Sequence, residues 1–211
     1  MFNDRVDAGK QLAKHLIRYR GSDSVLMALP RGGVPVAYQM ALDLHLPVEL
    51  ILAKKIGHPD HKEYAIGAAN LEDYFVVDPT RIQDLYIQKE INKIRKRLKI
   101  MQQSCMKDHQ SISIKNKIAI LVDDGMATGQ TIGAAIPLLR KQNPSQIIVA
   151  VPVASEQAYH AVSQSADEIH SLLIPSEFHG VGEFYIDFNQ VSDEEVLIYM
   201  DRLERLKKSN L

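Results

Sequence analysis

Two neighbouring carboxylates follow one apolar segment in the middle of the chain. Residues 118–122 read Ile-Ala-Ile-Leu-Val and lead directly into Asp123 and Asp124. Such a run is too short for a typical helix and predicts a buried parallel strand. Open α/β sheets bind their ligands at the carboxyl ends of the strands. Both carboxylates are therefore expected at a ligand crevice.

The residues after the acid pair have the composition of a phosphate-binding loop. They read Gly-Met and then Ala127, Thr128, Gly129, Gln130 and Thr131, from which an apolar periodicity predicts a helix. Main-chain N–H groups and the positive end of a helix can hold a phosphate. The two threonines add hydroxyl donors, and the glycine lets the main chain approach closely. Neither Gly-x-x-x-x-Gly-Lys-[Ser/Thr] nor Gly-x-Gly-x-x-Gly fits this loop.

The acid pair is expected to bind a different chemical group from the phosphate expected at the loop beside it. Asp123 and Asp124 would repel a phosphate, whereas their acceptor oxygens suit a diol such as the ribose hydroxyls, or a hydrated cation. The alternative is a buried strand with a polar turn that only starts a helix. The order of strand, acid pair and loop favours a binding site.

A second loop with phosphate chemistry follows another predicted strand, at residues 25–29. It reads Pro30, Arg31, Gly32 and Gly33, before a predicted helix at 34–44. Arg31 is a bidentate donor for phosphate oxygens, and the two glycines expose their N–H groups. The alternative is a tight turn with a surface arginine.

The elements that must position these loops alternate between strands and helices. Further strands are predicted at 48–53, 147–153 and 169–174, and helices at 4–20, 131–141 and, after a Ser192-x-x-Glu195 capping box, through residue 206. Gly21 is expected to end the first helix. This order predicts an α/β fold with an open parallel sheet flanked by helices, in a single domain over residues 1–211.

Residues 54–63 are polar and contain two helix breakers, so they predict a mobile excursion. Residues 63–70 and 75–77 are expected to form a β-hairpin around residues 71–73. Strand alternation suggests that only one of Lys54 and Lys55 points inward. His58 and His61 are interpreted as solvated loop histidines, with a metal pair as the alternative.

Residues 82–106 carry a regular apolar stripe and several basic side chains, which predicts a long helix docked on the domain. A dimer helix and a local nucleic-acid patch are the alternatives. Residues 107–116 are expected to be a polar linker.

Residues 176–188 mix aromatic, glycine and polar residues, as in a loop that stacks on a planar ligand. The alternative is a loop whose aromatics only cover the sheet end.

Composition excludes several classes of protein. The formal net charge is −1, which argues against broad binding to nucleic acid or anionic membranes. No apolar run approaches the length of a membrane span, and residues 1–5 lack the features of a signal peptide. Cys105 is the lone cysteine, so an internal disulfide is excluded and a nucleophile is not expected there. We expect a cytoplasmic protein.

The acid pair and its loop resemble the phosphoribosyl diphosphate (PRPP) signature of type I phosphoribosyltransferases. Most of the chain is similar to a group of such proteins with unassigned substrate. The matching segments are residues 2–9, 28–37, 54–57 and 181–188. Gly125 and Gln130 depart from the usual residues of the signature, and residues 102–116 lack an Arg-Gly-rich segment associated with the group.

The resemblance implies a transferase that displaces diphosphate from C1 of PRPP with a nitrogen nucleophile. Asp123 and Asp124 would hold the ribose hydroxyls, and residues 127–131 the 5′-phosphate. Arg31, Gly32, Gly33 and a lysine of the 54–55 pair would hold the diphosphate. Mg²⁺ would be carried mainly by the phosphates of PRPP, so no protein-only metal site is expected.

The resemblance also implies a flexible loop at about 54–77 and a C-terminal hood at about 175–191. The hood would select a small nitrogen acceptor, and Asp187 and Glu183 are guesses for its base. A homodimer fits this fold. The alternative function is a regulatory protein that binds PRPP or a nucleotide without turning it over. Nucleic-acid binding by the basic helix is the weakest hypothesis.

Overall fold

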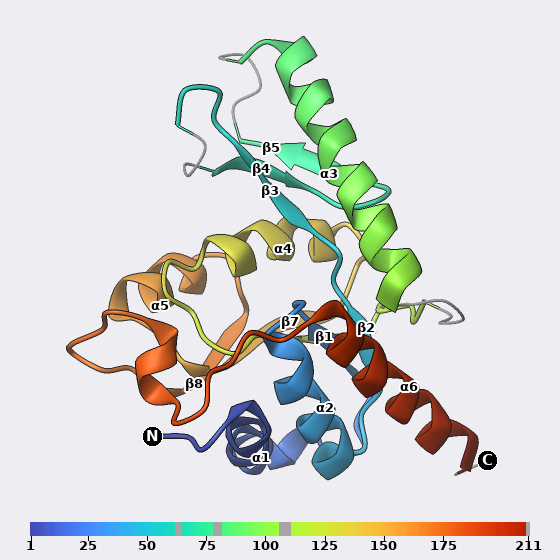
Figure 1. Ribbon diagram of the computed structural model, residues 1–211, viewed down its shortest axis with the longest axis vertical. Coiled ribbons are helices and arrows are strands. Elements are labelled where there is room, and N and C mark those ends of the chain that lie inside the picture. The colour runs from blue at the N-terminus through green and yellow to red at the C-terminus, as the bar shows by residue number, and fades with distance from the viewer. Residues whose placement is uncertain (62–64, 78–81, 106–110, 210–211) are drawn as a thin grey trace.

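The centre of the molecule is a parallel sheet with the strand order β2-β1-β6-β7-β8 (Figure 1). The computed structural model describes residues 1–61, 65–77, 82–105 and 111–209, with no side chains described for 104–105 and 207–209. The strands are β1 (Ser24–Ala28), β2 (Val48–Leu50), β6 (Ile118–Val122), β7 (Gln146–Val153) and β8 (Glu168–Leu173). The predicted open parallel sheet is confirmed.

Helices cover both faces of this sheet (Figure 1). They are α1 (Arg5–His15), α2 (Gly33–Leu44), α4 (Gln130–Arg140), α5 (Glu156–Ser163) and α6 (Asp193–Ser209), with short 3-10 helices η1 (Ile17–Tyr19) and η3 (Val181–Phe184). Strand residues alternate between two cores, as the pleat requires. Leu26 and Ile120 pack with α1 and α2. Met27 and Leu121 pack with α4 and α5.

Some predicted boundaries were wrong. The strand predicted at 48–53 ends at Leu50, because the chain leaves the sheet there to form a separate small sheet. The helix predicted at 4–20 ends at His15 and gives way to η1. Gly21, with φ +66°, therefore follows a 3-10 turn and does not cap the α-helix directly. The Ser192–Glu195 capping box is confirmed, with reciprocal hydrogen bonds of 2.8 and 3.1 Å.

A three-stranded antiparallel sheet, separate from the parallel one, packs on helix α4 (Figure 1). Its strands are β3 (Lys54–Gly57), β4 (Ala65–Ala69) and β5 (Tyr74–Val76). The predicted hairpin is present as β4 and β5. Residues 54–57, the start of the predicted mobile excursion, form β3, which pairs with β4 and buries Ile56 completely. Residues 62–64, the end of that predicted excursion, lie outside the described part of the chain.

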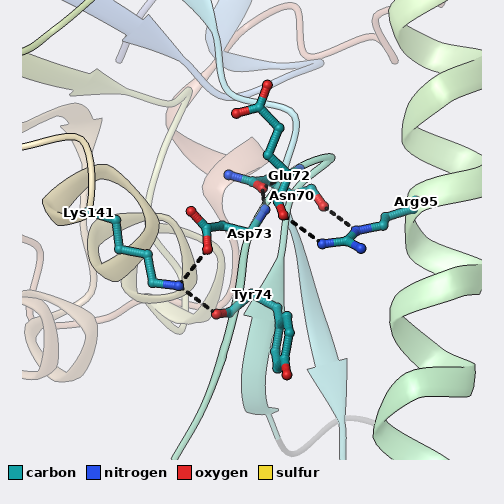
Figure 2. A network of polar contacts seen from close by, with 6 residues as sticks. All are labelled: Asn70, Glu72, Asp73, Tyr74, Arg95 and Lys141. Atoms are coloured by element: carbon teal, nitrogen blue, oxygen red, sulfur yellow. Dashed lines mark hydrogen bonds and ion pairs between the residues drawn. The ribbon is translucent and has the colours of Figure 1, made fainter.

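The turn between β4 and β5 is held from both sides by cations (Figure 2). Arg95 donates to the carbonyl oxygens of Asn70 and Glu72, at 3.3 and 2.8 Å. On the other side, Lys141 donates to Asp73 Oδ1 at 2.7 Å and to the Tyr74 carbonyl at 2.9 Å. This end of the predicted flexible loop is thus fastened to the helices on either side of it. The mobility of the loop stays a prediction.

The long helix α3 (Asp84–Cys105) connects the small sheet to the rest of the domain (Figure 1). Its stripe of Ile87, Ile91, Ile94 and Leu98 is buried in the core shared with α2 and α6. The docked-helix interpretation is confirmed. The side chain of Cys105 and residues 106–110, which include the first four residues of the predicted linker, lie outside what the structure describes.

Candidate active site

The loops after β1 and β6 are pressed together where the two neighbouring strands end. The N–H of Leu29 donates to the carbonyl of Val122 at 2.9 Å. A Cβ on Gly33 would lie 2.5 Å from that same carbonyl oxygen. A Cβ on Gly32 would lie 2.0 Å from Asp124 Oδ2. Only glycine therefore allows the loop at 30–33 to approach the acid pair this closely.

Asp124 forms an ion pair with a residue from the start of the chain. Arg5 Nε donates to Asp124 Oδ2 at 2.8 Å, and the two side chains are only 12% and 17% exposed. Arg5 also donates to the carbonyl of Asn189 at 2.8 Å and lies 3.9 Å from the ring centroid of Phe188. One guanidinium thus joins the acid pair to the segment that follows η3.

Tyr185 supports the same aspartate through its main chain. The Tyr185 hydroxyl donates to the carbonyl oxygen of Asp124 at 2.6 Å. Burial, with the nearby Asp124 carboxylate, raises the pKa of Tyr185 above its ordinary value, so the hydroxyl stays a donor. Phe2 pairs with the hood on both sides of this residue, through its N–H to Phe184 and its carbonyl to Ile186. The predicted hood segment is therefore tied to the N-terminal segment.

Asp123 has a different environment from Asp124. Burial, followed by the negative charge of Asp124, raises the pKa of Asp123 well above its ordinary value. Asp123 Oδ1 accepts the main-chain N–H of Asp124 at 2.9 Å. The two carboxylates therefore differ in the charges that surround them, because Asp124 forms an ion pair with Arg5. The pair thus combines a carboxylate held by a guanidinium with a buried carboxyl whose pKa is raised.

The loop at 127–131 presents main-chain donors at the start of α4. Within the described part of the chain, the N–H groups of Ala127, Thr128, Gly129 and Thr131 donate to no protein acceptor. Gly129 has φ +70°, a conformation that turns the chain into the helix and favours glycine. Ser155 Oγ steadies the loop by donating to the Ala127 carbonyl at 2.7 Å. This arrangement can bind a phosphate at a helix N-terminus.

The two lysines of β3 point to opposite sides, yet both reach parts of the site. Lys55 Nζ donates to Gln130 Oε1 at 3.1 Å, at the edge of the loop at 127–131. Lys54 lines a pocket beside Arg31. Arg31 itself pairs with Asp193 at the start of α6, at 3.6 Å between Nη1 and Oδ1. The structure thus places Lys54 beside Arg31 and the loop at 30–33, and Lys55 beside the loop at 127–131.

The hood covers the loop that follows the acid pair. A Cβ on Gly125 would lie 2.5 Å from Val181 Cγ1, so glycine at this unusual position lets Val181 pack directly over the loop. Phe178 and Phe184 stack on each other with centroids 5.6 Å apart. The candidate base Asp187 accepts from the Asn189 side chain at 2.7 Å, and Glu183 lies 3.3 Å from His179 Nδ1.

The described residues contain no group of three or more His, Cys, Asp or Glu side chains that could hold a metal ion. The His58 and His61 rings are stacked with centroids 6.0 Å apart. A cation at the acid pair would need most of its ligands from a bound molecule, because Asp124 Oδ2 already pairs with Arg5. In the same part of the chain, no helix is long and apolar enough to cross a membrane.

Sequence reasoning missed Arg5 and Tyr185 as site residues. Arg5 lies 119 residues from Asp124, and Tyr185 lies 61 residues from it. No local spacing connects residues so far apart, because only the docking of the N-terminal segment and the hood brings them together. The only signal was that both stand in segments that resembled the same family.

Comparisons with known proteins find relatives over nearly the whole chain. A family profile, the phosphoribosyl transferase domain, matches residues 2–189. Two curated proteins from Mycobacterium tuberculosis strains CDC 1551 and H37Rv, each named "Putative phosphoribosyl transferase", are 32% identical over 214 residues. These alignments cover 97% of this chain and 47% of each relative, so the chain spans about half the length of the curated relatives it matches.

A solved structure is similar over nearly the whole chain. The protein TT1426 from Thermus thermophilus is 33% identical, with a TM-score of 0.89. The match covers 96% of this chain and 98% of that chain.

Proposed function

The chain belongs to the phosphoribosyl transferase domain family, and from this premise we propose that it is a pentosyltransferase that uses PRPP with Mg²⁺. It transfers the phosphoribosyl group to a nitrogen atom of a small acceptor such as a nucleobase. The observation that carries the proposal is the placement of the acid pair. Asp123 and Asp124 lie between a loop of unbonded N–H groups at a helix start and the loop of Arg31, Gly32 and Gly33.

The three parts of PRPP match the three parts of the site. The N–H groups of residues 127–131 bind the 5′-phosphate. The carboxylates of the acid pair accept hydrogen bonds from the ribose hydroxyls. The loop at 30–33 and the lysines of β3 surround the diphosphate, and Lys55 closes the gap toward Gln130.

In the reaction, a bond forms between the acceptor nitrogen and C1 of the ribose while the bond from C1 to the diphosphate oxygen breaks. The diphosphate leaves with the bonding electron pair, and the acceptor nitrogen loses a proton. Positive charge develops on the ribosyl ring, where the ionised Asp124 can stabilise it. Arg5 keeps that carboxylate in place through its 2.8 Å hydrogen bond. Mg²⁺ bound with PRPP would supply positive charge to offset that of the leaving diphosphate, beside Arg31 and the lysines of β3.

Selection of the acceptor belongs to the hood in this proposal. Residues 178–188 supply aromatic rings and polar groups above the acid pair, and planar acceptors can stack on such rings. The homodimer stays a prediction, which light scattering on the purified chain would decide.

Calorimetric titration of Mg²⁺–PRPP tests the proposal. We expect saturable 1:1 binding to the wild type, weakened at least about tenfold in Asp124→Asn, because a charged hydrogen-bond acceptor is lost. Asp23→Asn is the matched control, since Asp23 also pairs with a cation, Lys117, at 2.7 Å but is 74% exposed. Wild-type protein that binds no PRPP at millimolar concentration would contradict the proposal.

A second step separates an enzyme from a binding protein. A panel of nucleobases and small amines is screened for diphosphate release from Mg²⁺–PRPP, with Asp124→Asn as the blank. Release that depends on one acceptor supports the transferase. Tight PRPP binding without release with any acceptor favours the alternative, a regulatory protein that only senses PRPP.

A further inference from the structure

An anion pocket lies on the α3 side of the loop that contains Arg31. The pocket has a volume of about 460 Å³ and is lined by Pro30, Arg31, Lys54, Arg97, Ile100, Met101 and Asp193. Its cations come from three separate elements: the loop after β1, strand β3 and helix α3. Arg31 and Lys54 were expected near each other from sequence, whereas the contribution of α3 was not.

The charges of this pocket favour a multiply charged anion. Arg31, Lys54 and Arg97 contribute positive charge, and Asp193 is the one carboxylate among the lining residues. Asp193 pairs with Arg31 at 3.6 Å, and both side chains are more than one-third exposed, so water screens this pair and a bound anion can compete for Arg31. The guanidinium of Arg97 forms no ion pair or hydrogen bond with any other residue that the structure describes.

Helix α3 holds Arg97 in place through packing on its opposite side. Leu98 and Ile94 are buried in the core beneath the helix, while Arg97 is exposed toward the pocket. The main chain of Arg97 is therefore held in place by the packing of the helix, while its guanidinium is accessible from the pocket. Lys96, the preceding residue, is exposed but does not line the pocket, because neighbouring helical residues point about 100° apart.

We propose that this pocket is the subsite for the outer phosphate of diphosphate, and that Arg97 of α3 is a diphosphate-binding residue. The inference rests on the proposed function, because the same loop at 30–33 would hold the inner phosphate. The pocket adjoins that loop through Pro30 and Arg31, so a diphosphate held at the loop can extend toward the three cations. It gives the basic face of α3 a role in substrate binding, and the guanidinium suits bidentate contact with phosphate oxygens.

Binding of inorganic diphosphate, measured by calorimetry with Mg²⁺ present, tests the assignment. The variants are Arg97→Gln and the matched control Lys96→Gln, which removes the same charge from the same helix. We expect Arg97→Gln to weaken diphosphate binding at least about tenfold and Lys96→Gln less than about twofold. Thermal unfolding of both variants checks that neither change disturbs the fold.

The outcomes also distinguish this inference from the proposed function. Equal weakening in the two variants would mean a general charge effect and would overturn the role of Arg97, even if PRPP binds. A wild type that binds no diphosphate would overturn the pocket. Selective loss in Arg97→Gln supports the pocket even if the wild type proves unable to bind PRPP, in which case only the transferase proposal fails.

Discussion

Arg5 and Asp124 are joined by a hydrogen-bonded ion pair of 2.8 Å across 119 residues of sequence. The same guanidinium contacts Phe188 and the carbonyl of Asn189, so one side chain connects the N-terminal segment, the acid pair and the end of the hood. Three elements of the site thus depend on one residue outside the signature loop.

Replacing Arg5 should reduce stability as well as activity. Arg5→Gln leaves a largely buried carboxylate without its cation, and we expect a loss of about 1.5–3 kcal/mol in the free energy of unfolding. The control is Arg18→Gln, whose ion pair with Glu168 is 57% and 37% exposed and should contribute at most about 1 kcal/mol. Urea unfolding measures both. Equal effects in the two variants would mean that the Arg5 pair contributes no more than a surface pair.

Gly32 should tolerate no side chain. In Gly32→Ala the new Cβ would lie 2.0 Å from Asp124 Oδ2, so either the loop at 30–33 or the carboxylate must move. We expect PRPP binding to fall at least about tenfold, since reacting groups must stay within about 0.5 Å of their positions. Gly133→Ala in α4 is the control, because nothing lies within 4 Å of its Cβ. It should keep binding and gain about 0.4–1 kcal/mol of stability.

Gly129 tests the phosphate loop separately. It has φ +70°, and Gly21, far from the site, has φ +66°. Alanine at either position incurs the left-handed backbone cost of about 1–2 kcal/mol. Only Gly129→Ala should also weaken the binding of ribose 5-phosphate, because it reorients the N–H groups at the start of α4. Similar ribose 5-phosphate affinity in the two variants would remove the loop at 127–131 from the phosphate site.

Asp123 should make stability depend on pH. Its pKa is raised in the folded protein by burial and by Asp124, so folding favours the protonated form. That contribution is complete below the unfolded pKa of about 3.9 and is lost as pH rises through the folded pKa. Asp123→Asn cannot titrate, so we expect it to be more stable than the wild type at pH 7 and to differ little near pH 3. Denaturant unfolding at both values, with Asp23→Asn alongside, checks this. An Asp123→Asn protein less stable than the wild type at pH 7 would contradict it.

The hydrogen bonds at the turn between β4 and β5 predict that this end of the flexible loop is restrained. Arg95 and Lys141 hold the turn at 70–74 through hydrogen bonds that include the carbonyls of Asn70, Glu72 and Tyr74 (Figure 2). Replacing both cations with Met should speed amide hydrogen exchange in β4 and β5, because the hairpin loses its two supports. Exchange unchanged from the wild type would show that strand pairing alone holds this end.

Sequence patterns predicted the parallel sheet, the order of its strands and helices along the chain, and the loops at 30–33 and 123–131. These follow from local patterns: a short apolar run makes a buried strand, and the residues just after it must lie at the sheet's carboxyl edge. Lys54 and Lys55 were also predicted, with alternating directions as on a strand. The pairing of that strand, β3, with β4 was not predicted, because the partner of a strand is set by tertiary structure.

The distant residues of the site could be identified only from the packing of the folded chain. Arg5 reaches Asp124 because α1 packs beside the sheet, Tyr185 because the hood folds back over it, and Arg97 because α3 docks against α6 and the small sheet. Each contact depends on how whole helices and strands pack against one another. Burial of apolar side chains drives that packing between residues far apart in the sequence, so the spacing of residues along the chain does not predict it. The raised pKa of Asp123 has the same origin, since burial and a neighbouring charge exist only in the folded chain.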